Sequence, residues 1–168
     1  MIIVKTIPHT TIKSTRFTNL ANTIALEANT DSFGSIIDSS EDYLIIGDPL
    51  DETRFLNSGS VYVYDRQSNT SRKIVSSFEY EDMQFGENIS LYGNYLVVTL
   101  GDNNSTGTGE FYLYNLDLED TDPNFEIKVE TSFSTSDFGD GLKIYEDYIY
   151  ISDLNNVYIY KIENNLVN

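Results

Sequence analysis

The stretch that decides the fold is Phe33-Gly34, followed by Asp42-Tyr43-Leu44-Ile45-Ile46-Gly47-Asp48-Pro49 and Gly59-Ser60-Val61-Tyr62-Val63-Tyr64. The same pattern opens twice more, at Phe85-Gly86 and Phe138-Gly139, with spacings of 52 and 53 residues. A tyrosine follows each of these phenylalanines after ten positions, and the three tyrosines are Tyr43, Tyr95 and Tyr148. A period near 50 with several short apolar runs in each unit is typical of a repeat array or a propeller.

Each unit is predicted to hold four short strands bounded by Gly, Asn, Asp and Ser. The expected first strands are residues 35–38, 88–91 and 141–144, and the second strands are 43–46, 95–98 and 148–151. The third strands follow within 59–64, 109–114 and 156–162, and fourth strands are expected only at 72–77 and 125–131. The second strands are almost continuously apolar, as expected where both faces of a sheet are covered. The pattern predicts an all-β fold of four-stranded antiparallel blades, stacked as a half or partial β-propeller.

The repeated Phe-Gly pairs are predicted to have packing roles. A phenylalanine fills the space between successive sheets, and the glycine beside it permits a close approach of two backbones. The residues assigned to this packing are Phe33, Gly34, Phe85, Gly86, Phe138 and Gly139, together with Tyr43, Tyr95 and Tyr148.

Composition narrows the range of partners. The 168 residues include 13 Tyr and 9 Phe, which favour strands, and the formal net charge is −17. A surface this acidic disfavours nucleic acid and anionic membranes, whereas cations, basic proteins and neutral glycans stay open as partners. The chain has no Cys, no apolar run of about 18 residues and no long apolar N-terminal segment, so neither a membrane span nor a signal peptide is expected. The compartment is left undetermined.

At these residues the chain resembles the FG-GAP repeat family, which builds the β-propeller of integrin α-subunits. The first unit is the most similar, with Asp48 in place of the usual Ala of the Gly-Ala-Pro segment. The other two units depart further, because Thr99-Leu100-Gly101 and Ser152-Asp153-Leu154 stand in that place. The resemblance covers about residues 23–162. It implies propeller blades that present loops to a protein partner.

Calcium sites of the family do not carry over to this chain. Some members hold calcium in an Asp-x-Asp-x-Asp-Gly-x-x-Asp loop between the first and second strands, but here those turns have three or four residues, too few for six to eight oxygen ligands. A looser site in the loops between the second and third strands is the remaining candidate. Its candidate ligands are Asp48, Asp51 and Glu52 in one loop, or Asp102, Asn103 and Asn104 in the next. No cofactor is required by the sequence.

Three blades do not close a ring, because propellers have four to eight. We expect residues 1–22 to form a strand-like arm and residues 23–168 a three-blade domain, in which 23–28 is an orphan closing strand and the third unit lacks its fourth strand. This predicts a head-to-tail homodimer with one six-bladed ring, in which each N-terminal strand completes the partner's third blade. The alternative is an open stack capped by other proteins, with residues 1–17 as an anchoring arm.

Little in the sequence points to catalysis. The one histidine, His9, lies outside the repeats, and there is no thiol. The acidic pairs Glu119-Asp120 and Asp137 with Asp140 offer two carboxyl groups for glycoside hydrolysis, but solvated loop acids are the simpler interpretation. We therefore predict a non-enzymatic interaction or structural module that presents variable rim loops to a protein partner. The alternatives are a glycan-binding propeller and a component of a large assembly such as a viral or surface-layer shell, with a glycoside hydrolase last.

Overall fold

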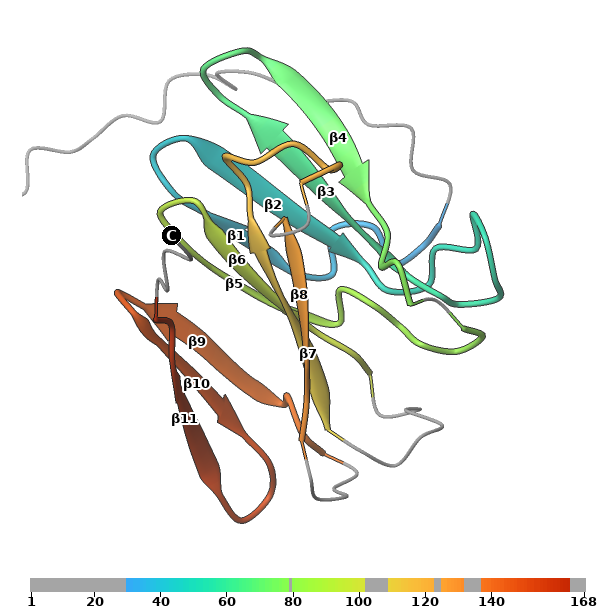
Figure 1. Ribbon diagram of the computed structural model, residues 1–168. Coiled ribbons are helices and arrows are strands. Elements are labelled where there is room, and N and C mark those ends of the chain that lie inside the picture. Colours follow the sequence, from blue (N-terminus) through green and yellow to red (C-terminus); the bar gives the residue numbers. More distant parts are fainter. Residues whose placement is uncertain (1–29, 79, 102–108, 123–124, 132–136, 164–168) are drawn as a thin grey trace, which may run out of the picture.

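The structure is a computed structural model that describes residues 30–78, 80–101, 109–122, 125–131 and 137–163. Over these ranges it contains strands and no helix, and the strands form three antiparallel sheets (Figure 1). The first sheet has the order β1 (Ile37–Ser39), β2 (Tyr43–Asp48), β3 (Ser60–Asp65), β4 (Thr70–Ile74). The second has the order β5 (Asn88–Tyr92), β6 (Tyr95–Thr99), β7 (Glu110–Asn115), β8 (Glu126–Glu130). The third has the order β9 (Gly141–Tyr145), β10 (Tyr148–Ser152), β11 (Val157–Lys161).

The all-β prediction with one blade-like sheet for each repeat is confirmed, and the ring is not closed. The register is the same in all three sheets, because the equivalent pairs Ile46↔Tyr62, Val98↔Tyr112 and Ile151↔Tyr158 lie opposite each other on the second and third strands. Since side chains alternate between faces along a strand, this register fixes which repeat positions share a face. We call the face that carries Tyr62, Tyr112 or Tyr158 the leading face of its sheet, and the opposite face the trailing face.

Two predicted strands begin two residues away from their observed first residue. The first strand was expected at 35–38 but β1 is Ile37–Ser39, because Ser35 instead donates its N–H to the Ser32 carbonyl in a turn. The fourth strand was expected at 72–77 but β4 begins at Thr70, which pairs with Asp65. The Asp65 carboxylate accepts backbone N–H bonds from the turn at 67 and 68, and this tight turn brings β4 in early.

The second sheet lies between the other two, as Figure 1 shows for β5–β8, and each junction has its own core. The core of the first junction is formed by the trailing face of the first sheet and the leading face of the second. The core of the second junction repeats this arrangement one sheet further on. Representative members are Ile45, Val61 and Val63 against Val98, Tyr112 and Tyr114 in the first core, and Val97, Phe111 and Leu113 against Ile144, Ile149 and Ile151 in the second.

The first strands of successive sheets are also linked by hydrogen bonds. The Asp38 carboxylate on β1 accepts the N–H of Leu91 on β5 at 2.8 Å, and the Ser90 hydroxyl on β5 accepts the N–H of Ile144 on β9 at 3.1 Å. The strands β1, β5 and β9 therefore run together along one side of the stack. That arrangement is the one expected of propeller blades around a common axis.

Several predicted features lie outside the described residues. These are the arm at 1–22 with His9, the strand at 23–28, and the loop with Asp102, Asn103 and Asn104. In the part of the chain that is described, no helix has the length and apolar character needed to cross a membrane.

Candidate functional site

The three Phe-Gly glycines make the same backbone contact in their own repeats. Each donates its N–H to the carbonyl oxygen near the end of the second strand, which ties the loop before the repeat to its sheet. Each also has a positive φ, a conformation in which glycine lacks the steric penalty of other residues. The bonds are Gly34 to Gly47 at 2.9 Å, Gly86 to Thr99 at 3.3 Å and Gly139 to Ser152 at 2.9 Å, with φ values of 81°, 94° and 107°.

Each repeated phenylalanine lies against the tyrosine on the leading face of its own sheet. The ring centroids are 5.2 Å apart for Phe33 and Tyr62, 5.5 Å for Phe85 and Tyr112, and 5.5 Å for Phe138 and Tyr158. Phe85 and Phe138 are buried at the two junctions between sheets. Phe33 occupies the equivalent place on the leading face of the first sheet, where the described residues provide no preceding sheet.

The repeated tyrosines lie in three different environments. Tyr43 reaches the next repeat, where its hydroxyl donates to the Asp117 carboxylate at 3.0 Å and the Leu116 carbonyl at 3.4 Å. Burial and this carboxylate raise the pKa of Tyr43 to about 12. Tyr95 packs against the second core, whereas Tyr148 is 39% exposed.

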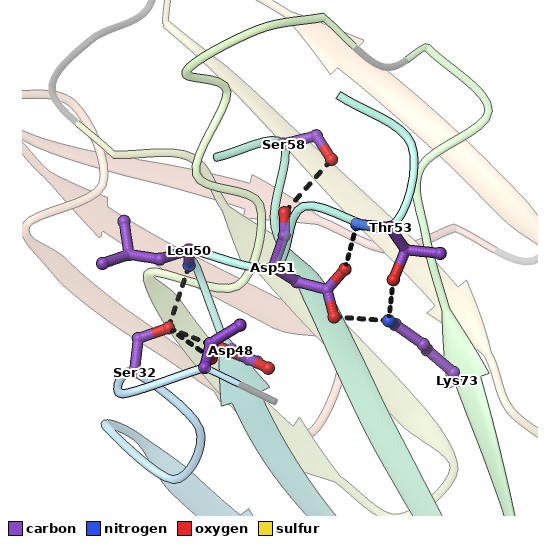
Figure 2. Close-up of polar contacts among 8 residues, drawn as sticks. Ser32, Asp48, Leu50, Asp51, Thr53, Ser58 and Lys73 are labelled. Carbon is purple, nitrogen blue, oxygen red and sulfur yellow. Dashed lines mark hydrogen bonds and ion pairs between the residues drawn. The ribbon is translucent and has the colours of Figure 1, made fainter. Parts of the chain in front are cut away.

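A cleft of about 530 Å³ lies beside the loop between β2 and β3. Figure 2 shows its polar centre, where the buried Asp51 carboxylate pairs with the Lys73 ammonium and accepts the Thr53 N–H at 2.8 Å. Lys73 also donates to the Thr53 hydroxyl at 2.6 Å. Burial acts to raise the pKa of Asp51, but the hydrogen bonds from Lys73 and Thr53 outweigh it and leave this pKa below its ordinary value. Asp51 therefore anchors the loop to β4.

Asp48 binds other partners than Asp51 does. Its carboxylate is fully buried and accepts the Ser32 hydroxyl at 2.5 Å (Figure 2). It also accepts the Thr30 hydroxyl. Its second carboxylate oxygen has no hydrogen-bond partner among the described residues. The aspartate that replaces the usual alanine of the family segment thus holds the entry loop of the repeat.

The structure does not gather the predicted calcium ligands of the first loop. Asp48 is bound to hydroxyl groups, Asp51 to an ammonium group, and Glu52 is exposed. Among residues whose positions are described, no group of three or more His, Asp or Glu is placed to hold a metal ion. The second candidate set, Asp102 with Asn103 and Asn104, lies outside those residues and stays a prediction.

The acidic pairs considered for hydrolysis lie in surface turns. Asp120 forms an ion pair with Arg72 on β4 at 2.7 Å, and the guanidinium carbon of Arg72 lies 5.0 Å from the centre of the Phe125 ring. Glu119 is exposed in the same turn. Asp120 is therefore used in a contact between repeats. Asp137 and Asp140 belong to the turn before β9.

The trailing face of the third sheet exposes apolar side chains at positions that the other two sheets bury. At the equivalent positions of the first two sheets, the six side chains that pack into the junctions are at most 8% exposed: Ile45, Val61 and Val63, then Val97, Phe111 and Leu113. On the third sheet, Tyr150 is 36%, Val157 65% and Ile159 64% exposed. The described part of this sheet also has no fourth strand beside β11, so β11 is an edge strand. We call Tyr150, Val157 and Ile159 the terminal face.

Sequence reasoning missed this face because it expected the second strand of every unit to be covered on both sides. The structure contradicts that expectation for β10, where exposed and buried residues alternate. The repeat register held the signal, since aligning the three units places Tyr150, Val157 and Ile159 at positions that two junctions bury.

Lys73 was also missed, because a single lysine in a polar strand has no sequence pattern that links it to Asp51.

Comparison with known proteins supports the repeat assignment. Residues 27–64 match the family model of the FG-GAP repeat. The match includes Phe33-Gly34, β1, β2 and most of β3, so the chain contains an FG-GAP repeat in its first unit. The repeat and the stacked sheets are those of a propeller-like interaction module. No curated protein and no solved structure matches the chain.

Proposed function

We propose that this chain is a non-enzymatic interaction module that binds another polypeptide through the terminal face and so extends its stack of blades. The observation that carries the proposal is the exposure of Tyr150, Val157 and Ile159 at positions where both internal junctions are closed. Exposed apolar surface of this kind on a folded protein is typical of an interaction site. Among the described residues no strand pairs with the outer edge of β11, and this edge offers backbone hydrogen bonds to the same partner.

The rim loops provide the specific part of the surface. The loop between β2 and β3 is held by Asp51 and Lys73, and it presents Phe55 and Leu56, which are 45% and 53% exposed. A loop fixed at its base loses little conformational entropy when it binds. We propose that a protein partner contacts this rim as well as the terminal face.

Site-specific photocrosslinking tests the proposal. A photoreactive residue is placed at Ile159, and at exposed Glu81 as a control, in the full chain expressed in its native source. The proposal expects a defined polypeptide, mapped by peptide sequencing, to be crosslinked from position 159 and not from position 81. Equal crosslinking from both positions, or none from position 159, would contradict it.

A glycan-binding function is the second candidate, favoured by the tyrosines on the trailing face of the third sheet. Tyr145, Tyr148 and Tyr150 are all exposed, and the Tyr145 ring lies 5.2 Å from that of Tyr92. Exposed aromatic side chains present flat apolar surfaces with a polar hydroxyl, which suit a neutral sugar. Titration with neutral oligosaccharides, followed by tyrosine fluorescence, distinguishes the two: saturable quenching that is lost in Tyr150→Ala supports the glycan.

A further inference from the structure

The terminal face has a complement on the same chain. We propose that it binds the leading face of the first sheet of a second copy, and that two such contacts close a head-to-tail dimer of six blades. This inference rests on the proposed function and names the partner.

The terminal face resembles the faces that fill the two internal junctions. Tyr150, Val157 and Ile159 occupy the places of the trailing-face residues that fill both internal cores. Burying apolar side chains gives the free energy of association at each junction, in proportion to the area removed from water. The third sheet therefore presents the same kind of surface that the second and third sheets each accept.

The leading face of the first sheet is the surface that would receive the terminal face. On β1, Ile37 is 64% exposed, whereas Ile89 at the equivalent position of β5 is 5% exposed because the first sheet covers it. Beside Ile37, Phe33 already lies against Tyr62 in the edge-to-face contact that Phe85 makes with Tyr112. The open part of this face, around Ile37, is thus arranged like the one that accepts a preceding sheet, whereas Ile46 and Tyr62 on the same face are already only 8% and 6% exposed.

The hydrogen bond that links the first strands at the internal junctions has no equivalent at the proposed contact. Asp38 and Ser90 each accept an N–H from the next sheet, but the equivalent residue of the third sheet is Lys143, which accepts no hydrogen bond. At the proposed contact the N–H in question is that of Ser39. It is already bound by the Asp38 carboxylate of its own chain at 2.8 Å. The change to lysine therefore leaves no N–H without a partner.

The equivalence of positions among the repeats also predicts a polar contact between the two copies. The Tyr43 hydroxyl donates to the carbonyl of Leu116, a residue whose own N–H is bound to the turn at Asn94. The equivalent of Leu116 in the first repeat is Arg66, whose N–H is bound to the turn at Asp42. At the contact between copies, the exposed Tyr148 hydroxyl therefore reaches the carbonyl of Arg66.

The two faces belong to one chain, which favours a second copy as the partner. Because one chain carries both halves of the contact, a second copy supplies both complements, and a rotation that closes gives a ring.

One residue makes this contact looser than the internal junctions. Gly59 and Gly109 lie directly under Phe85 and Phe138, where a Cβ would come within 2.3 Å and 2.6 Å of the next repeat. The third repeat has Asn155 at this position, three residues before Tyr158, as Gly59 and Gly109 are three residues before Tyr62 and Tyr112. Its Cβ keeps Phe33 of the second copy from lying as deep, so the dimer is weaker than a junction within the chain.

Sedimentation of the purified full chain over a range of concentrations tests the proposal. The wild-type chain is expected to form a dimer that dissociates on dilution. Ile159→Asp and Ile37→Asp each place a charge in both contacts and should weaken association at least about a hundredfold. Ile127→Asp, at an exposed position on β8 of the second sheet and outside the contact, should not change the dissociation constant. Asn155→Gly should tighten the dimer by about tenfold, since it restores the glycine of the two internal junctions.

The decisive measurement is a mixture of the two aspartate variants. A head-to-tail pair of Ile159→Asp with Ile37→Asp keeps one contact with both isoleucines intact, so the mixture should recover dimer that neither variant forms alone. Recovery also shows that both variants are folded. A wild-type monomer at all concentrations, a dimer unaffected by either variant, or variants that fail to complement each other would overturn the proposal. A monomeric pure chain that still crosslinks a different polypeptide from position 159 would overturn this inference and leave the proposed function standing.

Discussion

Gly59 lies so close to Phe85 that a Cβ on the glycine would be 2.3 Å from the Phe85 carbonyl oxygen and 2.4 Å from its nitrogen. The two residues form an isolated parallel bridge between the loop before β3 and the Phe-Gly pair of the next repeat. Gly59 also has a φ of 82°, which strains other residues. The contact joins one repeat to the next through backbone atoms alone.

Gly59→Ala is therefore expected to destabilise the protein by more than about 2 kcal/mol, because the left-handed conformation and the backbone clash both act against the methyl group. Gly93→Ala is the matched control. Gly93 has a φ of 60° but open space around its would-be Cβ, so this variant should lose only about 1–2 kcal/mol. Urea denaturation of both variants measures the difference, and equal losses would show that the close approach is not a constraint.

Phe85→Ala should destabilise by about 3–5 kcal/mol, since the ring is fully buried between two sheets and its removal leaves a cavity. Phe55→Ala, in the exposed rim loop, should change stability by no more than about 0.5 kcal/mol. Thermal unfolding followed by circular dichroism distinguishes them. A small loss for Phe85→Ala would mean that the ring does not support the junction.

Asp51 is expected to contribute to acid sensitivity. Its pKa in the folded protein is below the ordinary value of 3.8, so its contribution is present above that pH and is lost as the pH falls through the lower, folded value. Asp51→Asn should lower stability at neutral pH by about 1–3 kcal/mol, because Lys73 loses its charged partner. It should also flatten the decline of stability below pH 3.8, measured by urea titration at successive pH values. An unchanged acid profile would contradict the role assigned to this pair.

Tyr43 should contribute to alkaline sensitivity with the opposite sign. Its pKa is raised from 10.0 to about 12, so the folded state holds the proton more tightly, and this stability is present below pH 10 and lost as the pH rises through 12. Tyr43→Phe should lose about 1 kcal/mol at neutral pH, with the hydrogen bond to Asp117, and should show a shallower alkaline decline. A decline as steep as that of the wild type would contradict this prediction.

Calcium is expected to have little effect on the first repeat. Lys73 already neutralises Asp51, so an ion there would have to displace an ammonium group that is bound at two points. Melting temperatures with a chelator and with calcium at about 5 mM, above the weakest affinities of extracellular calcium modules, should agree. A calcium-dependent increase that Asp102→Ala abolishes would instead assign a site to the second loop. An increase abolished by Asp51→Asn would contradict the present account.

Much of the fold followed from local pattern. The Phe-Gly period, the ten-residue distance to Tyr43, Tyr95 and Tyr148, and the turn residues between strands gave three antiparallel sheets with nearly correct strands. These features were predictable because strand alternation and tight turns depend on residues close together in the chain. The start of β4 was not predictable, since the turn formed by Asp65 places the first residue of this strand two positions before the expected residue 72.

The partners of individual polar residues were not predictable. Asp48 and Asp51 are three positions apart, yet one binds hydroxyl groups of the entry loop and the other a lysine from β4. A sequence gives the chemical type of a side chain, whereas its partner depends on the strand that the fold places beside it.

The amino-acid sequence by itself determined the repeat, the all-β character and the glycines that the backbone requires, because each rests on contacts between near neighbours or on a fixed period. Only the tertiary structure decided which apolar positions are covered. Ile45, Val97 and Tyr150 are equivalent in the sequence, but the first two face a neighbouring sheet and the third faces solvent. The physical reason is that a side chain on a sheet face is buried only where a second sheet covers that face. The described residues provide such a sheet for two of the three trailing faces.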